Sequence, residues 1–496
     1  MAYPEELSIF DKPIQDLGVK QARCITYYPV NDFSSHGVIQ FRIPNNSGDY
    51  IDLRKTRLNV TCKIVRKDGK ILHDSIEGKE ATACNISSVL STTPTSAGKS
   101  SSTSSSDSSG GTSSGDSSGG TSSSTTSGDG KSSSGTAQND QASASKVNQD
   151  FVTIVNNIMH SLFSRVDIAL QDKILTNSDD CYPYEAYIKT LLMTTAEEKE
   201  GLQSQGFFQE KDCEISSSDT LGATPGKSVY LRRKLFKKSR EVDFSGPICS
   251  SVMEINKLIP NGVPLSITLH RSTNKFCLYT PLMGSGPDIY DVIITKATLS
   301  VCTVSIAPEI AIAHSEILSN RPAILPFNKT EVKKFTLAKG IYSSMINDPF
   351  QGAVPEQMII GIVKDSAQNG EYMANPYFFE HSNLNFLSVT VDGQPLGIDP
   401  LQVKYGKKPE EGNYLQGYQT LSGINGNGNP IKRLDYPHGF TLYRFHEEYE
   451  RNLKRKGNVT ISLRFDKALE QGMCLIVYAT FPGGIKVDKS RAVYDL

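Results

Sequence analysis

Two short stretches of this 496-residue sequence have the residue types of catalytic loops. Residues 115–119 read G-D-S-S-G, which fits the G-x-S-x-G pattern around a serine nucleophile. That chemistry needs a strained strand-to-helix turn, whereas this match lies in a Ser/Gly tract, where such matches arise by chance. Residues 222–228 read G-A-T-P-G-K-S, one residue too short between the glycines for a phosphate-binding P-loop, and no apolar strand precedes them. Neither stretch predicts an enzyme.

Metal and redox chemistry is not predicted either. The nine cysteines are scattered without a C-x-x-C pair, and the eight histidines show no H-E-x-x-H spacing. An odd number of scattered cysteines favours reduced thiols of a cytosolic or nuclear protein over a disulfide framework or a zinc site. We therefore expect no catalytic residue, no metal ligand and no cofactor.

The densest group of charges in the sequence is basic and surrounds Leu235 and Phe236. Three interpretations are open: a nuclear-import signal, an inward patch that contacts the phosphates of a packaged genome, or the solvated face of a strand. The solvated face is the default for a run of charges. Residues 451–456 form a smaller basic run with the same ambiguity. The members of the main cluster are Arg232, Arg233, Lys234, Lys237, Lys238 and Arg240.

Composition bounds the class of protein. The chain has 52 Lys and Arg against 53 Asp and Glu, whereas a protein whose whole surface grips nucleic acid should be clearly basic. Residues 95–144 are nearly all Ser, Gly, Thr and Asp, so they have too little apolar surface to offset the entropy of ordering, and we expect them to be disordered. The first residues resemble no signal peptide, and no apolar run is long enough for a transmembrane helix.

Most of the remaining chain alternates between apolar and polar residues, which is the period of half-buried strands. Leu475–Phe481 is almost continuously apolar, as a strand buried on both faces would be. Asp392-Gly393 predicts a hairpin turn, because these residue types tolerate positive φ. The alternating runs are Ile39–Ile43, Leu58–Ile64, Val166–Leu170, Leu265–Leu269, Ala297–Val301, Leu387–Val391 and Val459–Phe465, and Phe440–Phe445 is a further predicted strand.

Helical signals are few, and one internal repeat is present. Pro183–Met193 has apolar residues at helical spacing and a proline near its start, so it predicts a helix. A strand, a turn and a Tyr-rich segment follow one another twice, from Val166 to Leu191 and from Leu387 to Leu421. Two copies of one β-sandwich would give this order.

Several segments, in this order, resemble the major capsid proteins of Maverick/Polinton elements and adintoviruses. None of them is a catalytic motif, and the resemblance covers nearly the whole chain outside the Ser-rich segment. The segments are Phe41–Pro44, Tyr50–Leu53, Thr56–Val65, His160–Ile168, Tyr182–Tyr187, Asn383–Leu387, Asp392–Gln394 and Lys489–Arg491.

That resemblance implies an all-β chain of two consecutive eight-stranded jelly-roll β-sandwiches, a double jelly roll, with a few short helices in loops. It implies an N-terminal arm over residues 1–20, a first jelly roll over 21–305 and a second over 306–496. A disordered Ser/Gly-rich loop insertion would occupy residues 95–147 of the first jelly roll. Residues 56–65 would form its fourth strand, and the insertion would follow that strand and point outward.

The resemblance further implies a structural role as a major capsid protein, without enzymatic activity. Three chains would form a homotrimer, a hexon-like capsomer of pseudo-hexagonal outline, and capsomers would build an icosahedral shell around double-stranded DNA. The partners would be other copies of the chain in the capsid lattice, penton and minor capsid proteins and, at most indirectly, the genome DNA. The protein would be located in the virion capsid and assembled in the host nucleus or cytoplasm.

Two alternative functions stay open. A minor or penton capsid protein would combine one jelly roll with an appended domain and form pentamers, which the repeat disfavours. A non-viral β-sandwich that binds or hydrolyses carbohydrate would need aromatic platforms and paired carboxylates in a cleft, and the lack of Trp argues against it.

Overall fold

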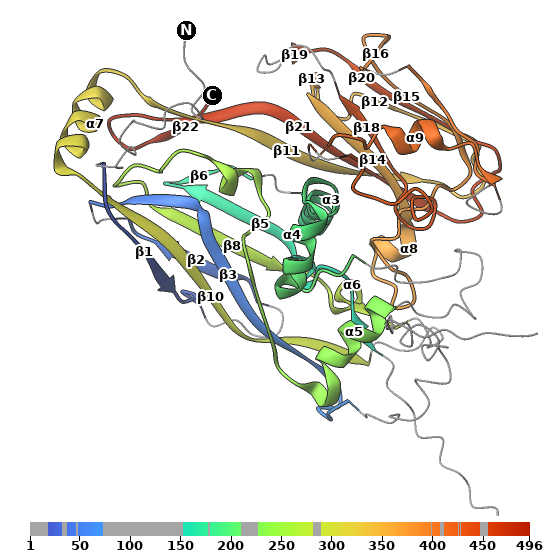
Figure 1. Ribbon diagram of the computed structural model, residues 1–496, viewed down its shortest axis with the longest axis horizontal. Coiled ribbons are helices and arrows are strands. Elements are labelled where there is room, and N and C mark those ends of the chain that lie inside the picture. The colour runs from blue at the N-terminus through green and yellow to red at the C-terminus, as the bar shows by residue number, and fades with distance from the viewer. Residues whose placement is uncertain are drawn as a thin grey trace, which may run out of the picture. The chain divides into compact units, whose positions relative to one another are not determined.

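The computed structural model shows a mostly β chain with short helices (Figure 1). Residues 1–74 and 150–496 belong to one compact unit, and its strands form two β-sandwiches of eight principal strands each. The ranges that the structure describes are 18–31, 37–45, 48–72, 152–176, 179–209, 227–280, 289–397, 399–406, 411–424, 426, 428–446 and 455–496. The Ser-rich segment that the sequence predicts to be disordered, 95–144, lies outside these ranges.

The first sandwich contains two four-stranded antiparallel sheets. One has the order β1-β10-β3-β7 and the other β2-β8-β5-β6, while β4 and β9 form a separate small pair. The predicted strand at residues 56–65 lies within β3, which is the third principal strand along the chain and not the fourth. The bounds are β1 Val19–Tyr27, β2 Ile39–Ile43, β3 Tyr50–Arg66, β4 Thr153–Ile154, β5 Phe163–Leu170, β6 Lys173–Ile174, β7 Val242–Gly246, β8 Leu265–Arg271, β9 Leu278–Tyr279 and β10 Tyr290–Ile306.

The second sandwich repeats this topology. Its sheets have the orders β11-β21-β14-β18 and β12-β20-β15-β16, with β22 added to β21 and β17 to β15. In both sandwiches the first principal strand pairs with the eighth and the second with the seventh, which is the strand order of a jelly roll. The bounds are β11 Ala323–Leu337, β12 Ser343–Asn347, β13 Ala353–Val354, β14 Gln357–Lys364, β15 Leu384–Val391, β16 Gln394–Pro395, β17 Leu401–Gln402, β18 Leu442–His446, β19 Arg455–Lys456, β20 Val459–Phe465, β21 Met473–Val487 and β22 Val493–Asp495.

Short helices lie in the connections. The helix predicted at Pro183–Met193 is confirmed as α3, with Pro183 in its first turn, and the smaller α9 follows the corresponding strands of the second sandwich. The bounds are α2 Ile158–Ser161, α3 Tyr182–Met193, α4 Ala196–Gly201, η3 Leu202–Gln205, α5 Lys227–Leu235, η4 Lys237–Ser239, η5 Ser251–Glu254, α6 Asn274–Cys277, α7 Pro308–Asn320, α8 Asp365–Gln368 and α9 Leu415–Gln419, where η marks a 3₁₀ turn.

The predicted hairpin turn at Asp392-Gly393 is also confirmed. It joins β15 to β16, and its two central residues have φ of 49° and 82°. Such positive values suit the right-handed twist of the flanking strands, and glycine adopts them without steric strain. Within the described ranges, none of the helices has the length and apolar content needed to cross a bilayer.

Candidate functional site

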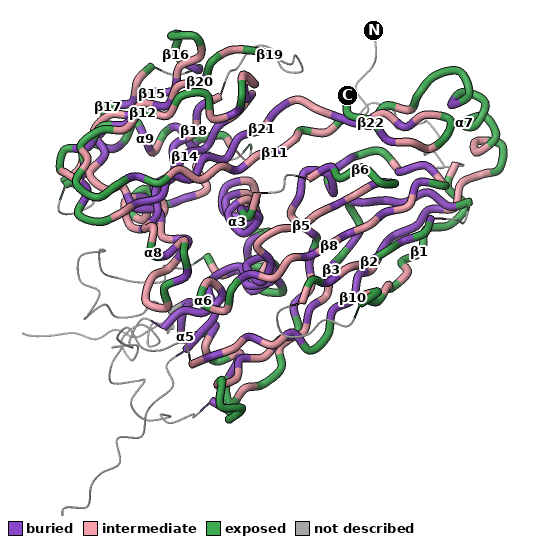
Figure 2. Tube along the Cα trace, turned by 180° about the vertical axis from the view of Figure 1, so that it is seen from behind, coloured by how far each residue is buried: buried purple, intermediate pink, exposed green. Residues whose placement is uncertain are grey.

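The two sandwiches share one continuous buried interface, and the sheet β11-β21-β14-β18 lies in its middle. On β21, Leu475 and Val477 belong to the core of the second sandwich, whereas Ile476 and Tyr478 belong to the cluster that also contains the core of the first. Figure 2 shows β21 buried along most of its length. The continuous apolar run at 475–481 therefore marks a strand covered on both faces, as the sequence predicts.

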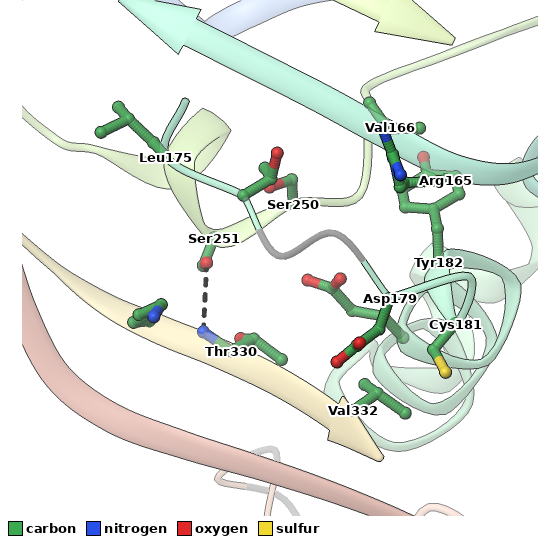
Figure 3. A pocket seen from close by; sticks show the side chains of 13 residues that line it. Arg165, Val166, Leu175, Asp179, Cys181, Tyr182, Ser250, Ser251, Thr330 and Val332 are labelled. Atoms are coloured by element: carbon green, nitrogen blue, oxygen red, sulfur yellow. Dashed lines mark hydrogen bonds between the residues drawn. The ribbon is translucent and has the colours of Figure 1, made fainter. Parts of the chain in front are cut away.

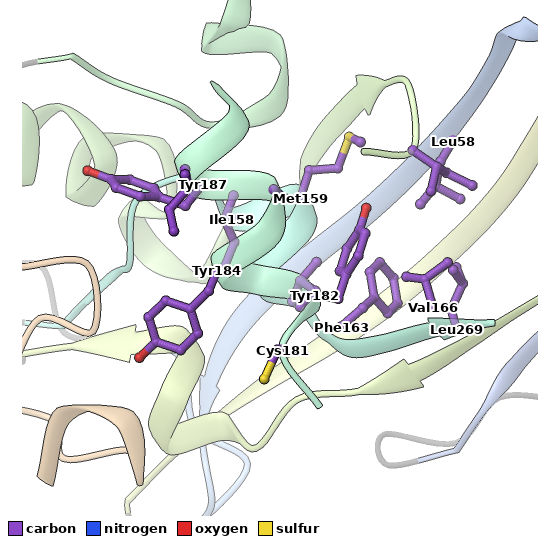
Figure 4. Close-up of a cluster of buried hydrophobic side chains, with 14 of the residues drawn as sticks. Leu58, Ile158, Met159, Phe163, Val166, Cys181, Tyr182, Tyr184, Tyr187 and Leu269 are labelled. Atoms are coloured by element: carbon purple, nitrogen blue, oxygen red, sulfur yellow. The ribbon is translucent and has the colours of Figure 1, made fainter. Parts of the chain in front are cut away.

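Helix α3 fills the space between the sandwiches with aromatic side chains. Tyr182 points toward the core of the first sandwich, while Tyr184 and Tyr187 point to the opposite side of the helix (Figure 4). There the Tyr187 ring stacks on Tyr377, with 4.2 Å between centroids and 8° between planes. Tyr184 and Phe276 each meet the same Tyr377 ring edge-on, at 5.9 and 6.2 Å. We call these four rings the aromatic cluster.

Several buried polar groups near the aromatic cluster are paired, although the Tyr184 hydroxyl has no hydrogen-bond partner among the described residues. The hydroxyl of Tyr377 lies 2.5 Å from Ser161 Oγ. His160 Nδ1 lies 2.8 Å from the Tyr182 hydroxyl, and His160 Nε2 lies 3.0 Å from Gln205 Oε1. Burial lowers the pKa of His160 to about 4, although the bond to Gln205 opposes that shift. This neutral, fully enclosed imidazole stabilises the fold and has no access to a substrate.

A small group of charges lies at the same interface, between α3, η5 and β21, with Glu185 and Lys189 partly buried and Glu254 exposed. Lys189 Nζ and Glu254 Oε1 are 2.5 Å apart. Burial raises the pKa of Glu185 to about 7, with Lys189 lowering it and Glu254 raising it. Burial acts to lower the pKa of Lys189, but its neighbours Cys249, Glu254 and Tyr478 raise it overall, so the lysine stays charged. A partly buried lysine such as Lys189 is tolerated when an opposite charge pairs with it.

A cavity of about 30 Å³ lies beside these charges (Figure 3). Residues of β5, α3, η5 and β11 line it, among them Arg165, Glu185 and Thr330. The Thr330 backbone N–H donates to Ser251 Oγ over 3.4 Å, which links the two sandwiches at its edge. Pockets for small molecules are usually some 300–1,000 Å³, whereas this cavity has room for little more than water. It is not a substrate site.

The basic cluster is helical, so the default interpretation as a strand face is wrong. Arg232, Arg233 and Lys234 belong to α5, and Lys237 and Lys238 to η4. Arg232 is fully buried and its Nε donates to the Ile154 carbonyl over 3.0 Å, so it contributes to the core. Exposed Arg240 donates to the carbonyls of Leu235 and Lys234 and thereby caps the end of α5. Only part of the predicted patch is therefore exposed, namely Lys234, Lys237, Lys238 and Arg240.

The remaining motifs do not assemble into a catalytic centre among the described residues. The G-D-S-S-G stretch at 115–119 lies outside the described ranges, as does most of 222–228, whose last two residues open α5. In the described part of the chain, no group of three or more His, Cys, Asp or Glu side chains has the arrangement of a metal site. Residues 451–454 of the second basic run also lie outside.

Several exposed apolar side chains lie on α7 and on or near the edge strand β12. On α7, Ile312 and Ile317 are 61% and 47% exposed, and near and on β12 Tyr342 and Met345 are 62% and 63% exposed. Edge strands and apolar surface of this kind are sites where further chains bind. We treat them as candidate assembly surfaces.

No family model matches the sequence. An uncharacterised protein of Caenorhabditis elegans is 22% identical over 356 residues, which cover 68% of this chain and 80% of that protein. Among solved structures, a chain of the Sputnik virophage is similar with a TM-score of 0.58 and 10% identity over 100% of this chain and 92% of that one.

Two further structures are similar. The Faustovirus major capsid protein matches with a TM-score of 0.54 and 9% identity, over 96% of this chain and 92% of that one. The mavirus major capsid protein matches with a TM-score of 0.50 and 12% identity, over 100% and 95%. The fold is the double jelly roll of these capsid proteins. At such identities the likeness establishes the fold.

Sequence reasoning missed most residues of the interface between the sandwiches. It placed Tyr184 and Tyr187 on a helix, but gave no sign that Tyr377 would meet them from the other sandwich. Lys189 and Glu254 were not singled out either. The available signals were Glu185 and Lys189, two charges within the apolar helix pattern of Pro183–Met193.

Proposed function

We propose that this protein is a major capsid subunit, whose activity is assembly. The observation that carries the proposal is the pair of jelly rolls with identical topology, fused through one buried interface, in a chain that matches capsid proteins over nearly its full length. A rigid tile with two similar sandwiches offers six comparable edges once three copies associate. Such tiles cover a closed shell with few distinct kinds of contact.

The finer assignments rest on this coarser one. We propose that three chains form a pseudo-hexagonal, hexon-like homotrimer, and that these capsomers build an icosahedral capsid around double-stranded DNA. The exposed apolar side chains on α7 and β12 support contacts between copies. Penton and minor capsid proteins would be further partners, and assembly would occur in the host nucleus or cytoplasm.

The proposed lineage is that of Maverick/Polinton elements and adintoviruses. The support is the order of sequence segments that resemble their capsid proteins, together with a relative in an animal, Caenorhabditis elegans. We also propose the domain limits 1–20, 21–305 and 306–496. The last of these boundaries falls at the end of β10, next to α7, which connects the sandwiches.

We propose no enzymatic activity and no cofactor. The exposed lysines of the basic cluster are proposed to be a solvated helix surface, with genome contact at most indirect, because the chain as a whole carries a net charge of only −1. If they bound genome phosphates, association with DNA would weaken steeply with salt, and neutralising Lys234, Lys237 and Lys238 would reduce that slope. If these lysines formed a nuclear-import signal, the same variant would fail to accumulate in the nucleus.

Two alternatives are less well supported. A penton protein with one jelly roll and an appended domain does not fit two jelly rolls of the same topology. A carbohydrate-binding β-sandwich gains no support from the cavity beside α3, which at about 30 Å³ is too small for a sugar.

The test is the mass of the purified chain in solution, measured by light scattering after size exclusion, followed by electron microscopy of concentrated samples. A stable mass of three chains, with shells or sheets of hexagonal tiles on concentration, would support the capsid proposal. A stable monomer that never forms such arrays would overturn it, and a pentamer would favour the penton alternative.

A further inference from the structure

Two cysteines face each other across a pair of antiparallel strands. In the register of β1 and β10, Cys24 lies directly opposite Cys302. Directly opposite residues project to the same face of the sheet, with Cα atoms about 4.5–5.5 Å apart. That separation falls within the range of about 4.4–6.8 Å that a disulfide spans without backbone movement.

The surroundings of the two thiols differ. Cys24 is exposed, whereas Cys302 is only 4% exposed and has Asp52 of β3 as its partner on the other side. Burial raises the pKa of the Cys302 thiol, and so do the neighbouring Cys24 and the charge of Asp52, while Lys55 lowers it. The direct pairing in the strand register places the two thiols side by side on one face of the sheet. An exposed thiol with a buried resolving thiol beside it is an arrangement suited to reversible oxidation.

The strand that carries Cys24 is weakly anchored. β1 is the edge strand of its sheet, and six of its nine residues are exposed in a row from Val19 to Cys24. Apart from its backbone ladder with β10, its side-chain anchors include an ion pair between Arg23 and Asp49 at 2.7 Å, in which Arg23 is 55% exposed. Strands with so little buried surface open locally at low cost in free energy.

We propose that Cys24 and Cys302 form an oxidation site, at which a small-molecule disulfide such as glutathione disulfide converts the dithiol into a cross-strand disulfide. The Cys24 thiolate attacks one glutathione sulfur, which gives a mixed disulfide and releases one glutathione thiolate. Cys302 then loses its proton to solvent and attacks the Cys24 sulfur, and the second glutathione leaves. Two electrons pass from the cysteines to the glutathione disulfide, and the two protons end on the two glutathione thiols.

The consequence is a covalent link between the edge strand and the centre of its sheet. In a reducing compartment the pair stays as thiols and β1 can open, whereas oxidation fixes β1 on β10. This inference depends on the geometry of one chain and stands whether or not the protein builds capsids.

The experiment uses the full-length chain, treated with glutathione disulfide and mapped by mass spectrometry without reduction. We expect a peptide pair that joins Cys24 to Cys302 and has lost two hydrogen atoms. Amide hydrogen exchange in β1 should slow by about tenfold or more on oxidation and recover with a reductant. The cross-strand disulfide should form faster at higher pH, because Cys302 must lose its proton before it attacks.

Two variants separate this site from nonspecific thiol oxidation. Cys302→Ser should hold the glutathione adduct on Cys24, because nothing resolves it. The matched control is the double variant Cys24→Ser, Thr26→Cys, which places the exposed thiol opposite Ser300 and not opposite Cys302. The glutathione adduct on its new cysteine should likewise persist. A wild-type chain that ends as a persistent Cys24 adduct, or as a dimer linked through two Cys24 side chains, would overturn the proposal.

Discussion

Replacing Tyr377 with Ala should weaken the interface between the two sandwiches. Tyr377 is 2% exposed and stacks on Tyr187, while Tyr184 and Phe276 contact its ring from the sides. Truncation of a buried aromatic side chain costs about 3–5 kcal/mol, because the lost transfer free energy adds to that of the cavity left behind. We expect a loss of about 4 kcal/mol, a large fraction of the 5–15 kcal/mol by which folded proteins are usually stable.

Tyr377→Phe isolates the hydroxyl from the ring. This variant keeps the stacking and loses only the contact with Ser161 Oγ. Ser161 retains the carbonyls of Asn156 and Asn157 as acceptors, at 3.1 and 3.0 Å, so it is not left unpaired. The expected cost is therefore about 1 kcal/mol.

Denaturant-induced unfolding of the purified chain, followed by fluorescence and by circular dichroism, measures these costs. Tyr342→Ala is the matched control: this tyrosine is 62% exposed, so its truncation should change the free energy of unfolding by no more than about 0.5 kcal/mol. Because the interface is shared, we also expect Tyr377→Ala to separate one transition into two. If Tyr377→Ala behaved like Tyr342→Ala, the aromatic cluster would not couple the sandwiches and the reasoning would be refuted.

Three further predictions concern charge and the insertion. Glu185 has a pKa of about 7 in the folded state against an ordinary value of 4.5, so the folded state binds more protons than the unfolded state between these pH values. The free energy of unfolding of the wild type should therefore fall by about 3 kcal/mol as pH rises from 4.5 through 7. Glu185→Gln should remove that fall in denaturation curves taken across this range. Arg232→Ala should lower the free energy of unfolding by about 3 kcal/mol, whereas Lys234→Ala, at an exposed neighbouring position, should change it by less than about 0.5 kcal/mol. Equal effects of the two substitutions would contradict a core role for Arg232. Deleting residues 95–144 should leave solubility, oligomeric mass and melting temperature unchanged, since the segment has almost no apolar surface to bury, and loss of soluble protein would disprove this.

The sequence predicts the strands well where one face of a sheet meets solvent. Leu58–Ile64 alternates because β3 buries every second residue, and the burial pattern follows that alternation. The hairpin at Asp392-Gly393 could be predicted from the local sequence, because only a few residue types adopt positive φ easily. The internal sequence repeat could be detected because a helix follows the corresponding strands in both sandwiches, α3 in the first and α9 in the second.

Elements without a clear period were missed. In α7 the apolar residues Ile310, Ile312 and Ile317 do not form one helical stripe, because the helix buries only Leu318. Helix α5 was not predicted, because its run of charges favoured the interpretation as a solvated strand face. In the structure Arg232 of this helix is buried. A buried arginine cannot be distinguished from an exposed one by composition, since its tertiary hydrogen bond to Ile154 forms only in the folded chain.

Contacts between the sandwiches depend on residues far apart in the chain. Tyr187 and Tyr377 are 190 positions apart, and each alone is an ordinary core aromatic residue. Likewise, the pairing of Lys189 with Glu254 requires η5 to lie against α3. One sequence contains no record of such pairs, because any aromatic or charged partner of suitable size would satisfy the same local pattern.

The two sandwiches share a topology but not an environment, and the sequence records that difference in its apolar pattern. In the sheet β1-β10-β3-β7 the outer face is polar: Asn59 accepts from Ser245 Oγ over 2.6 Å and lies 3.4 Å from Ser300 Oγ. The equivalent face of β11-β21-β14-β18 carries Ile476 and Tyr478, which the first sandwich covers. One sheet thus lies inside the fused unit, while its counterpart keeps a polar face. Alternation in β3 and continuity in β21 are the consequence, so the apolar period shows which of two repeated sheets is covered, although not what covers it.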